Sequence, residues 1–221
     1  MLKDRSNQKE LLDLGQYTPR QYQRCLKLLG RVGKLLGGDR ITKRALLKLQ
    51  KRPRTILDVG CGGGQLALSI ARANPDIQVT GIDINPDAIA YAKKKSKTTS
   101  NITFEKQADR MEGNYDVVMA TLVCHHMSDD EIVSFLQDAR KIANNAVIIN
   151  DLHRHPFAWI SYAAIAPFLF PSWMVWHDGL LSIRRGFIKK DLETYLSRAG
   201  FDLGRCTIER KFPFRWVVTI R

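Results

Sequence analysis

The segment that most restricts the fold is the decapeptide Thr-Ile-Leu-Asp-Val-Gly-Cys-Gly-Gly-Gly at residues 55–64. A short β-prone run ends in a carboxylate and passes directly into a glycine cluster. Because glycine has no Cβ, such a turn lets the backbone approach a nucleotide-like ligand, and the N–H groups of the next helix then face that ligand. A dinucleotide fingerprint starting at Gly60 needs glycine at position 65, where the chain has Gln65, so the usual nicotinamide register fails.

The rest of the chain alternates between strand and helix patterns. Apolar spacing predicts two leading helices at 18–36 and 40–50. After them we expect strands at 55–60, 78–83, 102–106, 115–121 and 146–151, helices at 64–73, 86–96, 129–143 and 189–199, and two last strands at 202–210 and 214–220. Alternation of this kind is typical of an α/β fold with a right-handed parallel sheet, which binds ligands at the carboxyl ends of its strands.

Length and cysteine usage suggest one domain over residues 1–221. The four cysteines are scattered without a C-x-x-C pair, which argues against a disulfide framework or a zinc knuckle. The first residues show no apolar leader, so we expect a cytoplasmic protein. The sequence carries no signal for an oligomeric state.

The chain is strongly basic, with a formal net charge of +13. Such an excess can favour nucleic acid, anionic membranes or acidic substrates. Much of it lies in the predicted leading helices and in the lysines of 93–97, without interleaved aromatics or a known RNA-binding module. We therefore expect a solvated basic surface and not a specific nucleic-acid site.

The acidic residue and alternating glycines, Asp58, Gly60, Gly62 and Gly64, follow the pattern acid-x-G-x-G-x-G. In this pattern the chain resembles the class I S-adenosylmethionine-dependent methyltransferases, most of all the small-molecule branch typified by quinone-biosynthesis C-methyltransferases. The resemblance spans residues 55–151. It implies a Rossmann-like three-layer sandwich with a mostly parallel seven-stranded sheet and an antiparallel last strand. It divides the chain into an N-terminal helical cap (1–52), a cofactor-binding core (53–151), an apolar lid (152–188) and a C-terminal part (189–221).

The cofactor site is predicted position by position. Asp83 ends the second strand about 20 residues after the glycine turn, where a carboxylate can accept both ribose hydroxyls; Asn85 is the better helix cap. The resemblance places Ile84 against the adenine, Asp109 with its neighbour Arg110 near the adenine amino group, and Asp58 near the methionine amino group. It also assigns backbone contacts with the cofactor to Cys61, Ala120 and Thr121.

The residues after the fourth strand, Ala-Thr-Leu-Val-Cys-His-His, exclude two groups of relatives. DNA amino-methyltransferases have an acid or amide followed by Pro-Pro and an aromatic residue at this place. Cytosine C5 enzymes need a Pro-Cys nucleophile, whereas Cys124 follows Val123. We expect Cys124 to be a small buried side chain.

Histidines follow two strands that should be neighbours. His125 and His126 follow the fourth strand, and His153 and His155 follow the fifth. Imidazole titrates near neutrality, so His126, His153 and His125 are candidate general bases, with His126 and His153 favoured. The alternative is that these histidines only brace loops. A metal site was weighed and not adopted, because the nearby acids form no recognisable ligand pattern.

Residues 156–176 contain no charged side chain and are nearly long enough to cross a membrane. Pro167 and Pro171 should interrupt a helix there, and a span at this point would separate the sheet from its last strands. We expect instead a lid over an apolar acceptor pocket. Candidate pocket residues are Tyr17, His155, Trp159, Tyr162, Phe168 and Trp173, with Arg5 helping to close the cofactor site.

The sequence therefore predicts a methyltransferase that uses S-adenosylmethionine and acts on an oxygen or carbon of a small lipophilic, aromatic or polyketide-like acceptor. Peripheral membrane contact through the aromatic lid and its basic flanks is an additional hypothesis. An RNA methyltransferase, a cofactor-binding module without turnover, and a nicotinamide reductase are the alternatives.

Overall fold

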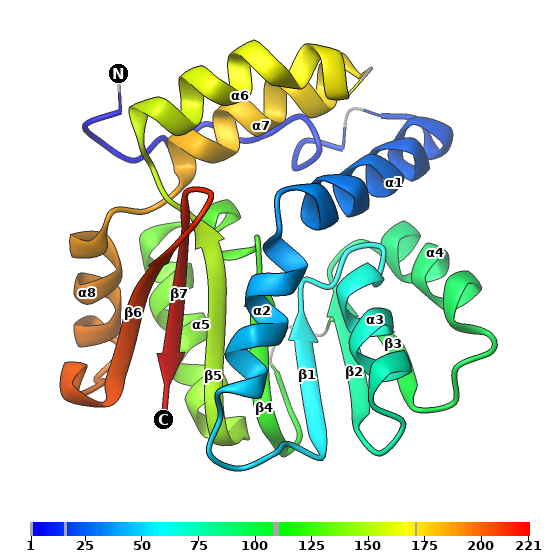
Figure 1. Ribbon diagram of the computed structural model, residues 1–221, viewed down its shortest axis with the longest axis vertical. Helices are drawn as coiled ribbons and strands as arrows, with labels where there is room; N and C mark the ends of the chain where they lie inside the picture. Colours follow the sequence, from blue (N-terminus) through cyan, green and yellow to red (C-terminus); the bar gives the residue numbers. More distant parts are fainter. Residues whose placement is uncertain (1, 16, 108–110, 171) are drawn as a thin grey trace.

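A computed structural model describes residues 2–15, 17–107, 111–170 and 172–221, and a seven-stranded sheet forms the centre of this described part. In chain order the strands are β1 (Thr55–Val59), β2 (Gln78–Asp83), β3 (Ile102–Lys106), β4 (Tyr115–Thr121), β5 (Ala143–Leu152), β6 (Cys206–Lys211) and β7 (Arg215–Ile220). They lie in the order β3-β2-β1-β4-β5-β7-β6. β1 to β5 pair in parallel and β7 is antiparallel to both neighbours, which confirms the predicted fold (Figure 1).

Helices cover both faces of the sheet. The helices of the described residues are α1 (Pro19–Leu35), α2 (Gly38–Leu47), α3 (Gln65–Ala73), α4 (Pro86–Ser96), α5 (Asp129–Ile142), α6 (Pro156–Leu169), α7 (Trp173–Arg185) and α8 (Lys189–Arg198), with 3-10 turns η1 (Cys124–His126) and η2 (Leu203–Arg205). Helices α2, α3 and α4 pack on one face with Ile56, and α5 and α8 pack on the other with Leu57. Side chains alternate along a strand, so consecutive residues of β1 supply both apolar layers.

The carboxyl ends of the parallel strands lie beneath α6, α7 and the N-terminal segment (Figure 1). The Asp178 carboxylate of α7 accepts hydrogen bonds from the N–H groups of Leu11 and Leu12, at 2.9 and 3.1 Å. The Arg5 guanidinium donates to the carbonyls of His125 and Met127 after β4. The N-terminal segment thus fastens the lid to the sheet.

The prediction that Pro167 interrupts the helix after β5 is wrong. Helix α6 runs through Pro167 and ends two residues later. Proline removes one N–H donor from a helix, but α6 buries Ala166, and Phe170 after it, in an apolar cluster with α1 and α7. The Phe170 N–H also closes the last turn on the Ala166 carbonyl at 2.8 Å, so packing compensates for the proline. Pro171 lies outside the described residues.

Two predicted boundaries differ from the structure at the sheet's last strands. β6 begins at Cys206, not at residue 202, because the Asp202 side chain accepts the Gly204 N–H at 2.9 Å and holds the turn η2. β5 begins at Ala143, directly after α5, and not at residue 146. The other predicted helices and strands lie within three residues of their observed bounds, so the largest difference is at β6, the edge strand.

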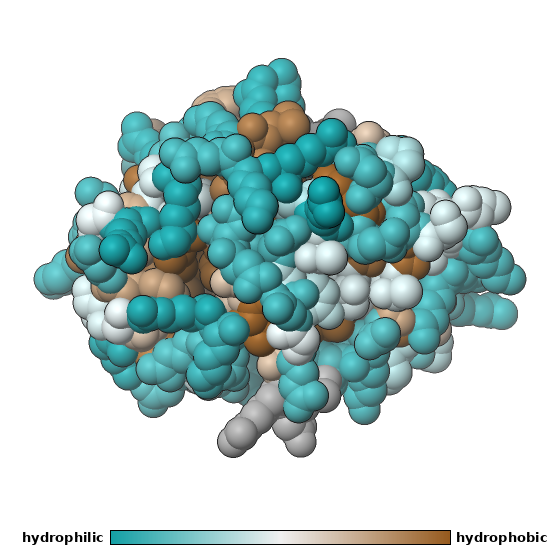
Figure 2. All heavy atoms as spheres, turned by 90° about the horizontal axis from the view of Figure 1, so that it is seen from below, coloured by the Kyte–Doolittle hydropathy of each residue, from teal (hydrophilic) through white to brown (hydrophobic). Residues whose placement is uncertain are grey.

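Apolar surface is concentrated around the lid. The end of the molecule away from α6 and α7 is mostly hydrophilic, with small scattered apolar areas (Figure 2). Six large apolar side chains on α6 and at the start of α7 are exposed, namely Phe157, Ile160, Ile165, Phe168, Leu169 and Trp173. None of the described helices has the length and apolar character needed to cross a membrane.

Candidate functional site

The glycine turn after β1 adopts backbone angles that other residues rarely adopt. Gly60, Gly62 and Gly64 have φ angles of 66°, 53° and 72°. A Cβ on Gly60 would lie 2.5 Å from Val123, and one on Gly64 would lie 2.5 Å from Phe104. At Gly62 the same position is open. The turn therefore packs tightly on the protein at its ends and leaves room for a ligand in its middle.

Asp83 at the end of β2 is oriented by backbone amides. One carboxylate oxygen accepts the Gly62 N–H at 2.7 Å, and the other accepts the Asn85 N–H at 2.9 Å. Burial raises the pKa of Asp83, and these two hydrogen bonds oppose the shift. Asn85 caps α4 with its own side chain, so Asp83 is not needed as the cap. A carboxylate offers about four acceptor positions, which leaves capacity for hydroxyl groups of a ligand.

Of the remaining predicted positions at this edge, the structure describes Tyr17 and Ile84 only. The Tyr17 hydroxyl accepts a hydrogen bond from Asn85 at 2.8 Å, and its ring stacks on Tyr22 at 4.6 Å between centroids. Tyr17 thus lies beside the end of β2 and not under the lid. Ile84 is 73% exposed, as a surface for a flat ligand would be. The predictions for Asp109 and Arg110 lie outside the described residues.

Asp58 at the end of β1 is buried and lines the large cavity below the lid. Burial, together with the negative charges of Asp83 and Asp39, raises the pKa of Asp58 to about 8. A cationic group bound beside this carboxyl group would favour its ionised form. Cys61 offers its backbone to the cavity, because its Sγ lies only 3.0 Å from the position of a Cβ on Gly81, and burial raises the pKa of the thiol.

The end of β4 forms the next part of the wall. Ala120 is fully buried, and the Thr121 hydroxyl hydrogen-bonds the Thr42 hydroxyl of α2 at 3.0 Å. Leu122 follows with a positive φ of 59°, which turns the chain toward the histidine pair. Of the two predicted contacts, Thr121 lines the cavity, together with Leu122, which was not predicted, whereas Ala120 is not among the described lining residues.

The cavity has a volume of about 1360 Å³ and extends from the glycine turn to the lid. Typical ligand pockets measure about 300–1,000 Å³, so this one has room for a cofactor and an acceptor together. The lid contributes Ala158, Tyr162, Ile165, Ala166, Leu169 and Phe170 to its lining. Most of this part of the wall is apolar, as a lipophilic ligand requires.

Of the predicted pocket residues, Tyr162 lines the cavity, where its hydroxyl donates to the Val175 carbonyl at 2.8 Å. Tyr17, His155, Trp159, Phe168 and Trp173 are not among the described lining residues. His155 caps α6, with its Nδ1 accepting the Phe157 N–H at 3.2 Å. Phe168 and Trp173 are 88% and 63% exposed. Phe168 and Trp173 therefore lie on the outside of the lid.

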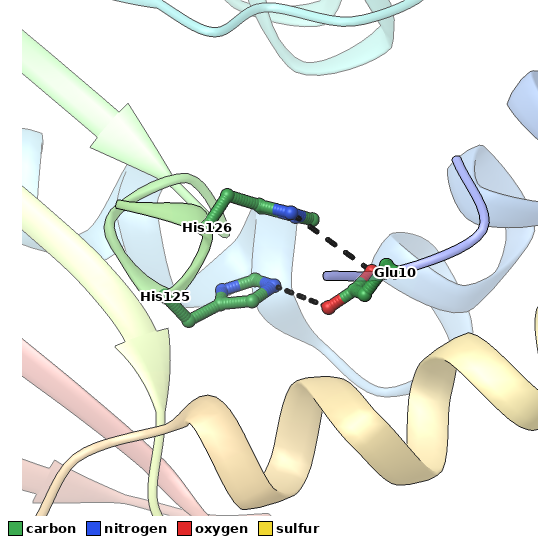
Figure 3. Close-up of side chains that lie close together, drawn as sticks. All are labelled: Glu10, His125 and His126. Carbon is green, nitrogen blue, oxygen red and sulfur yellow. Dashed lines mark ion pairs between the residues drawn. The ribbon is translucent and has the colours of Figure 1, made fainter. Parts of the chain in front are cut away.

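The histidine pair after β4 meets a glutamate from the N-terminal segment (Figure 3). His125 Nδ1 lies 2.7 Å from the Asp151 carboxylate of β5, and both side chains are almost completely buried. A carboxylate only accepts, so Nδ1 carries the proton and Nε2 keeps a lone pair when the ring is neutral. His125 Nε2 lies 3.8 Å from Glu10 Oε1, and both residues line the cavity. This geometry is that of an oriented base.

The other two candidate bases differ from His125. His126 Nδ1 lies 2.9 Å from Asp13. Burial opposes charge on His126, but the hydrogen bond to Asp13 and the charge of Glu10 outweigh it and raise the pKa of the ring. His153 packs edge-on against Trp216, and burial and the neighbouring His155 lower its pKa to about 4. His126 therefore holds a proton more firmly than a free imidazole does, whereas His153 is neutral at pH 7 and weakly basic.

Glu10, His125 and His126 also have the composition of a metal site. Each offers one ligand atom, and the three atoms lie within 4.8 Å of one another. Two imidazoles and a carboxylate are ligands for a divalent transition metal, and the Asp151 contact on His125 would orient the ring. Glu10 has no motif around it that would predict this set from the sequence.

Four residues at this site were missed by sequence reasoning as functional candidates: Glu10, Asp13, Asp151 and Arg215. Asp151 carried a usable signal, since it ends the strand next to the one that precedes the histidine pair. Glu10 and Asp13 carried none, because the segment before α1 shows no motif. Arg215 reaches the cavity only because β7 inserts between β5 and β6.

Comparisons with known proteins agree with this geometry. A family model described as a methyltransferase domain matches residues 56–146. An uncharacterized methyltransferase of Synechocystis is 28% identical over 193 residues, which cover 84% of this chain and 85% of that protein. A ubiquinone biosynthesis O-methyltransferase of Sodalis glossinidius is 31% identical over 115 residues. That match covers 48% of this chain and 45% of the enzyme, so the chain aligns with about half of this relative.

A solved structure shares the fold over almost the whole chain. Human N-acetylserotonin methyltransferase in complex with S-adenosylmethionine superimposes with a TM-score of 0.67 and 17% identity. The superposition covers 92% of this chain and 56% of the human protein. At this identity the likeness establishes the architecture and leaves the acceptor open.

Proposed function

We propose, on the basis that this chain belongs to the class I S-adenosylmethionine-dependent methyltransferases, that it methylates an oxygen or carbon of a small lipophilic acceptor. The observation that carries the proposal is the continuity of one cavity, which joins the glycine turn, the oriented His125 and the apolar lid. The ubiquinone-biosynthesis relative supports an aromatic acceptor, since its name places it in the modification of a lipophilic quinone precursor.

The glycine turn and the two acidic strand ends fit the cofactor. The open side of Gly62 admits it, and Asp83, held by two amides, is positioned to accept the ribose hydroxyls. Asp58 is buried beside the turn, where its carboxylate would pair with the methionine ammonium. When bound, S-adenosylmethionine supplies an electrophilic methyl group on a positively charged sulfur.

The chain must then align the acceptor and remove its proton where the acceptor atom requires this. We propose His125 as the base: Asp151 holds its Nδ1–H, and Nε2 takes the proton from the acceptor hydroxyl or activated carbon. Asp151 stabilises the resulting imidazolium, and Glu10 lies close enough to add to that effect. His126 is less suited because its contacts with Asp13 and Glu10 raise its pKa and stabilise its protonated form, and His153 because its pKa is about 4.

The experiment that tests the proposal supplies the purified protein with S-adenosylmethionine labelled in the methyl group and an extract of small molecules. Mass spectrometry should show a lipophilic metabolite that gains the label. Asp83→Ala, made as a control, should lose the transfer at low cofactor concentration. Labelling of bulk RNA with salt-sensitive retention would support an RNA methyltransferase instead. Tight cofactor binding without transfer to any fraction would support a module without turnover.

We also propose that the lid approaches anionic membranes when the acceptor is collected. The six exposed apolar side chains on α6 and α7 and the net charge of +13 support this. Sedimentation with vesicles containing phosphatidylserine should retain the protein, and Phe168→Ser should weaken retention without changing thermal stability. Equal retention of the Phe168→Ser variant and the unchanged protein would contradict membrane contact through the lid.

A further inference from the structure

Arg215, the first residue of β7, is a buried cation that faces the same cavity. Its side chain is 2% exposed, yet Arg215 belongs to the cavity lining. Its Nη1 has no hydrogen-bond partner among the described residues. A buried charged donor without a partner is costly, since it has lost its water without compensation. Nη1 is itself shielded from solvent beside the cavity wall, so a ligand in the cavity would supply the missing acceptor after a small shift of the guanidinium.

The carboxylates near Arg215 do not supply the missing hydrogen-bond acceptor. Burial lowers the pKa of Arg215, and Asp151 and Asp39 act in the opposite direction through space. Within the described part of the chain, no carboxylate oxygen lies within the 4.0 Å of an ion pair with it. Asp151 is already hydrogen-bonded to His125. Nearby carboxylates therefore balance part of the Arg215 charge through space, and its Nη1 still lacks an acceptor among the described residues.

The N-terminus of α2 meets the same guanidinium. Its N-cap residue, Gly37, has a φ of 70° and supplies no side-chain cap. A Cβ on Gly38 would lie 3.1 Å from Arg215 Nη2, so the guanidinium lies directly against the first turn of the helix. Backbone N–H groups at a helix N-terminus attract anions. The guanidinium and the helix N-terminus thus meet at one point of the wall, with Asp39 of the first turn as the acidic residue beside them.

The cavity lining contains further cations. Arg40 and Arg44 of α2 line the same cavity. Lys48 and Lys211 also line it, and their Nζ atoms lie 3.7 and 2.8 Å from Glu209 Oε1. Together with Arg215 these cations outnumber the two carboxylates, Asp39 and Glu209, that α2 and β6 contribute to the lining.

We propose that Arg215 and the first turn of α2 bind a carboxylate of the methyl acceptor, whose apolar body lies under the lid. The proposal rests on the proposed function only in taking the ligand of this cavity to be the acceptor. A planar guanidinium fork matches a carboxylate in two parallel hydrogen bonds. β7 lies three strands from β1, roughly 14 Å at the usual strand spacing, which favours the acceptor over the cofactor as the source of the carboxylate.

The test measures binding of 4-decyloxybenzoate and of the uncharged 4-decyloxybenzamide by calorimetry, with the protein saturated by S-adenosylhomocysteine. We expect the acid to bind at least about tenfold tighter than the amide. Arg215→Met, which keeps the volume, should abolish this preference. Arg205→Gln, which removes an exposed cation elsewhere, should leave it unchanged. Equal binding of both probes, or binding of neither, would overturn the proposal.

A second variant covers the case in which Arg215→Met does not fold. Gly38→Ala leaves Arg215 in place and inserts a methyl group against its guanidinium, so the preference for the acid should fall several-fold. A preference that survives this change would contradict the site. If Arg215→Met instead weakens binding of S-adenosylhomocysteine, the carboxylate is the cofactor's and the proposal fails. Binding is measured without turnover, so an absence of methyl transfer would count against the proposed function alone.

Discussion

The proposed cofactor end and the proposed acceptor end of the cavity are built in opposite ways. At the cofactor end, the glycine turn and Asp83 come from one continuous stretch, β1 to β2. At the acceptor end, Glu10, His125, Asp151 and Arg215 come from four separate segments of the chain. The first end is organised by backbone conformation, and the second by side chains that meet only in the folded protein. Changes at each end should therefore have different consequences.

The largest effect should come from the backbone of the cofactor end. Gly64→Val would place a Cβ 2.5 Å from Phe104 at a φ of 72°. Strain and overpacking together should lower the free energy of unfolding by about 3 kcal/mol or more. Urea denaturation measures this loss. Gly62→Ala, also at positive φ but facing open space, should cost only about 1 kcal/mol. If both substitutions lower the free energy of unfolding equally, the contact with Phe104 does not explain the loss.

The next effect should appear at the acceptor end without harming the cofactor end. His125→Gln removes the proposed base, so kcat should fall about 10²- to 10⁴-fold, while calorimetry shows unchanged affinity for S-adenosylhomocysteine. His155→Gln, away from the cavity lining, serves as the control. The assay should be repeated with a chelator. Activity lost on chelation and restored by a divalent metal would assign Glu10, His125 and His126 to a metal instead.

A smaller effect is expected from Asp83→Ala, which should weaken cofactor binding by about 1–3 kcal/mol, the scale of charged hydrogen bonds. Asp83 also accepts two backbone N–H groups, so part of the loss will come from a looser turn. Asp83→Asn separates the two contributions, because it keeps one acceptor for the turn. Calorimetry that finds unchanged affinity in both variants would contradict the ribose contact.

The smallest effect should be a pH dependence at Asp58, whose pKa is raised to about 8. Below that pH the folded protein holds a proton here that the unfolded chain releases near its ordinary pKa. Stability should therefore fall as pH rises toward 8, while affinity for the cationic cofactor increases, roughly fivefold from pH 7 to 8. Calorimetry at several pH values measures the trend, and Asp58→Asn should flatten it. A wild-type affinity independent of pH would contradict an ammonium contact.

The two ends also differ in how far the sequence predicts them. The spacing of the glycines and Asp83 encodes their proximity, because a strand, a tight turn and a parallel neighbour leave little freedom. The sequence predicts the histidines as candidate bases and favours His126 and His153, whereas the contacts in the structure favour His125 as our proposed base. That choice depends on Asp151, Asp13 and burial, which adjust each imidazole differently. The outward position of Trp173 also depends on how α7 packs, which local spacing does not encode.

By itself, the sequence determined the order of strands and helices, the parallel core and the glycine turn, because each follows from local periodicity and from backbone angles that only glycine adopts easily. Tertiary structure alone decided which groups line the proposed acceptor end. Glu10 reaches His125 because the N-terminal segment crosses over the sheet, where Ser182 of α7 donates to its carboxylate at 2.7 Å. Arg215 reaches the cavity because β7 pairs antiparallel with β5, opposite Leu152. Contacts between distant segments arise from the packing of the whole chain.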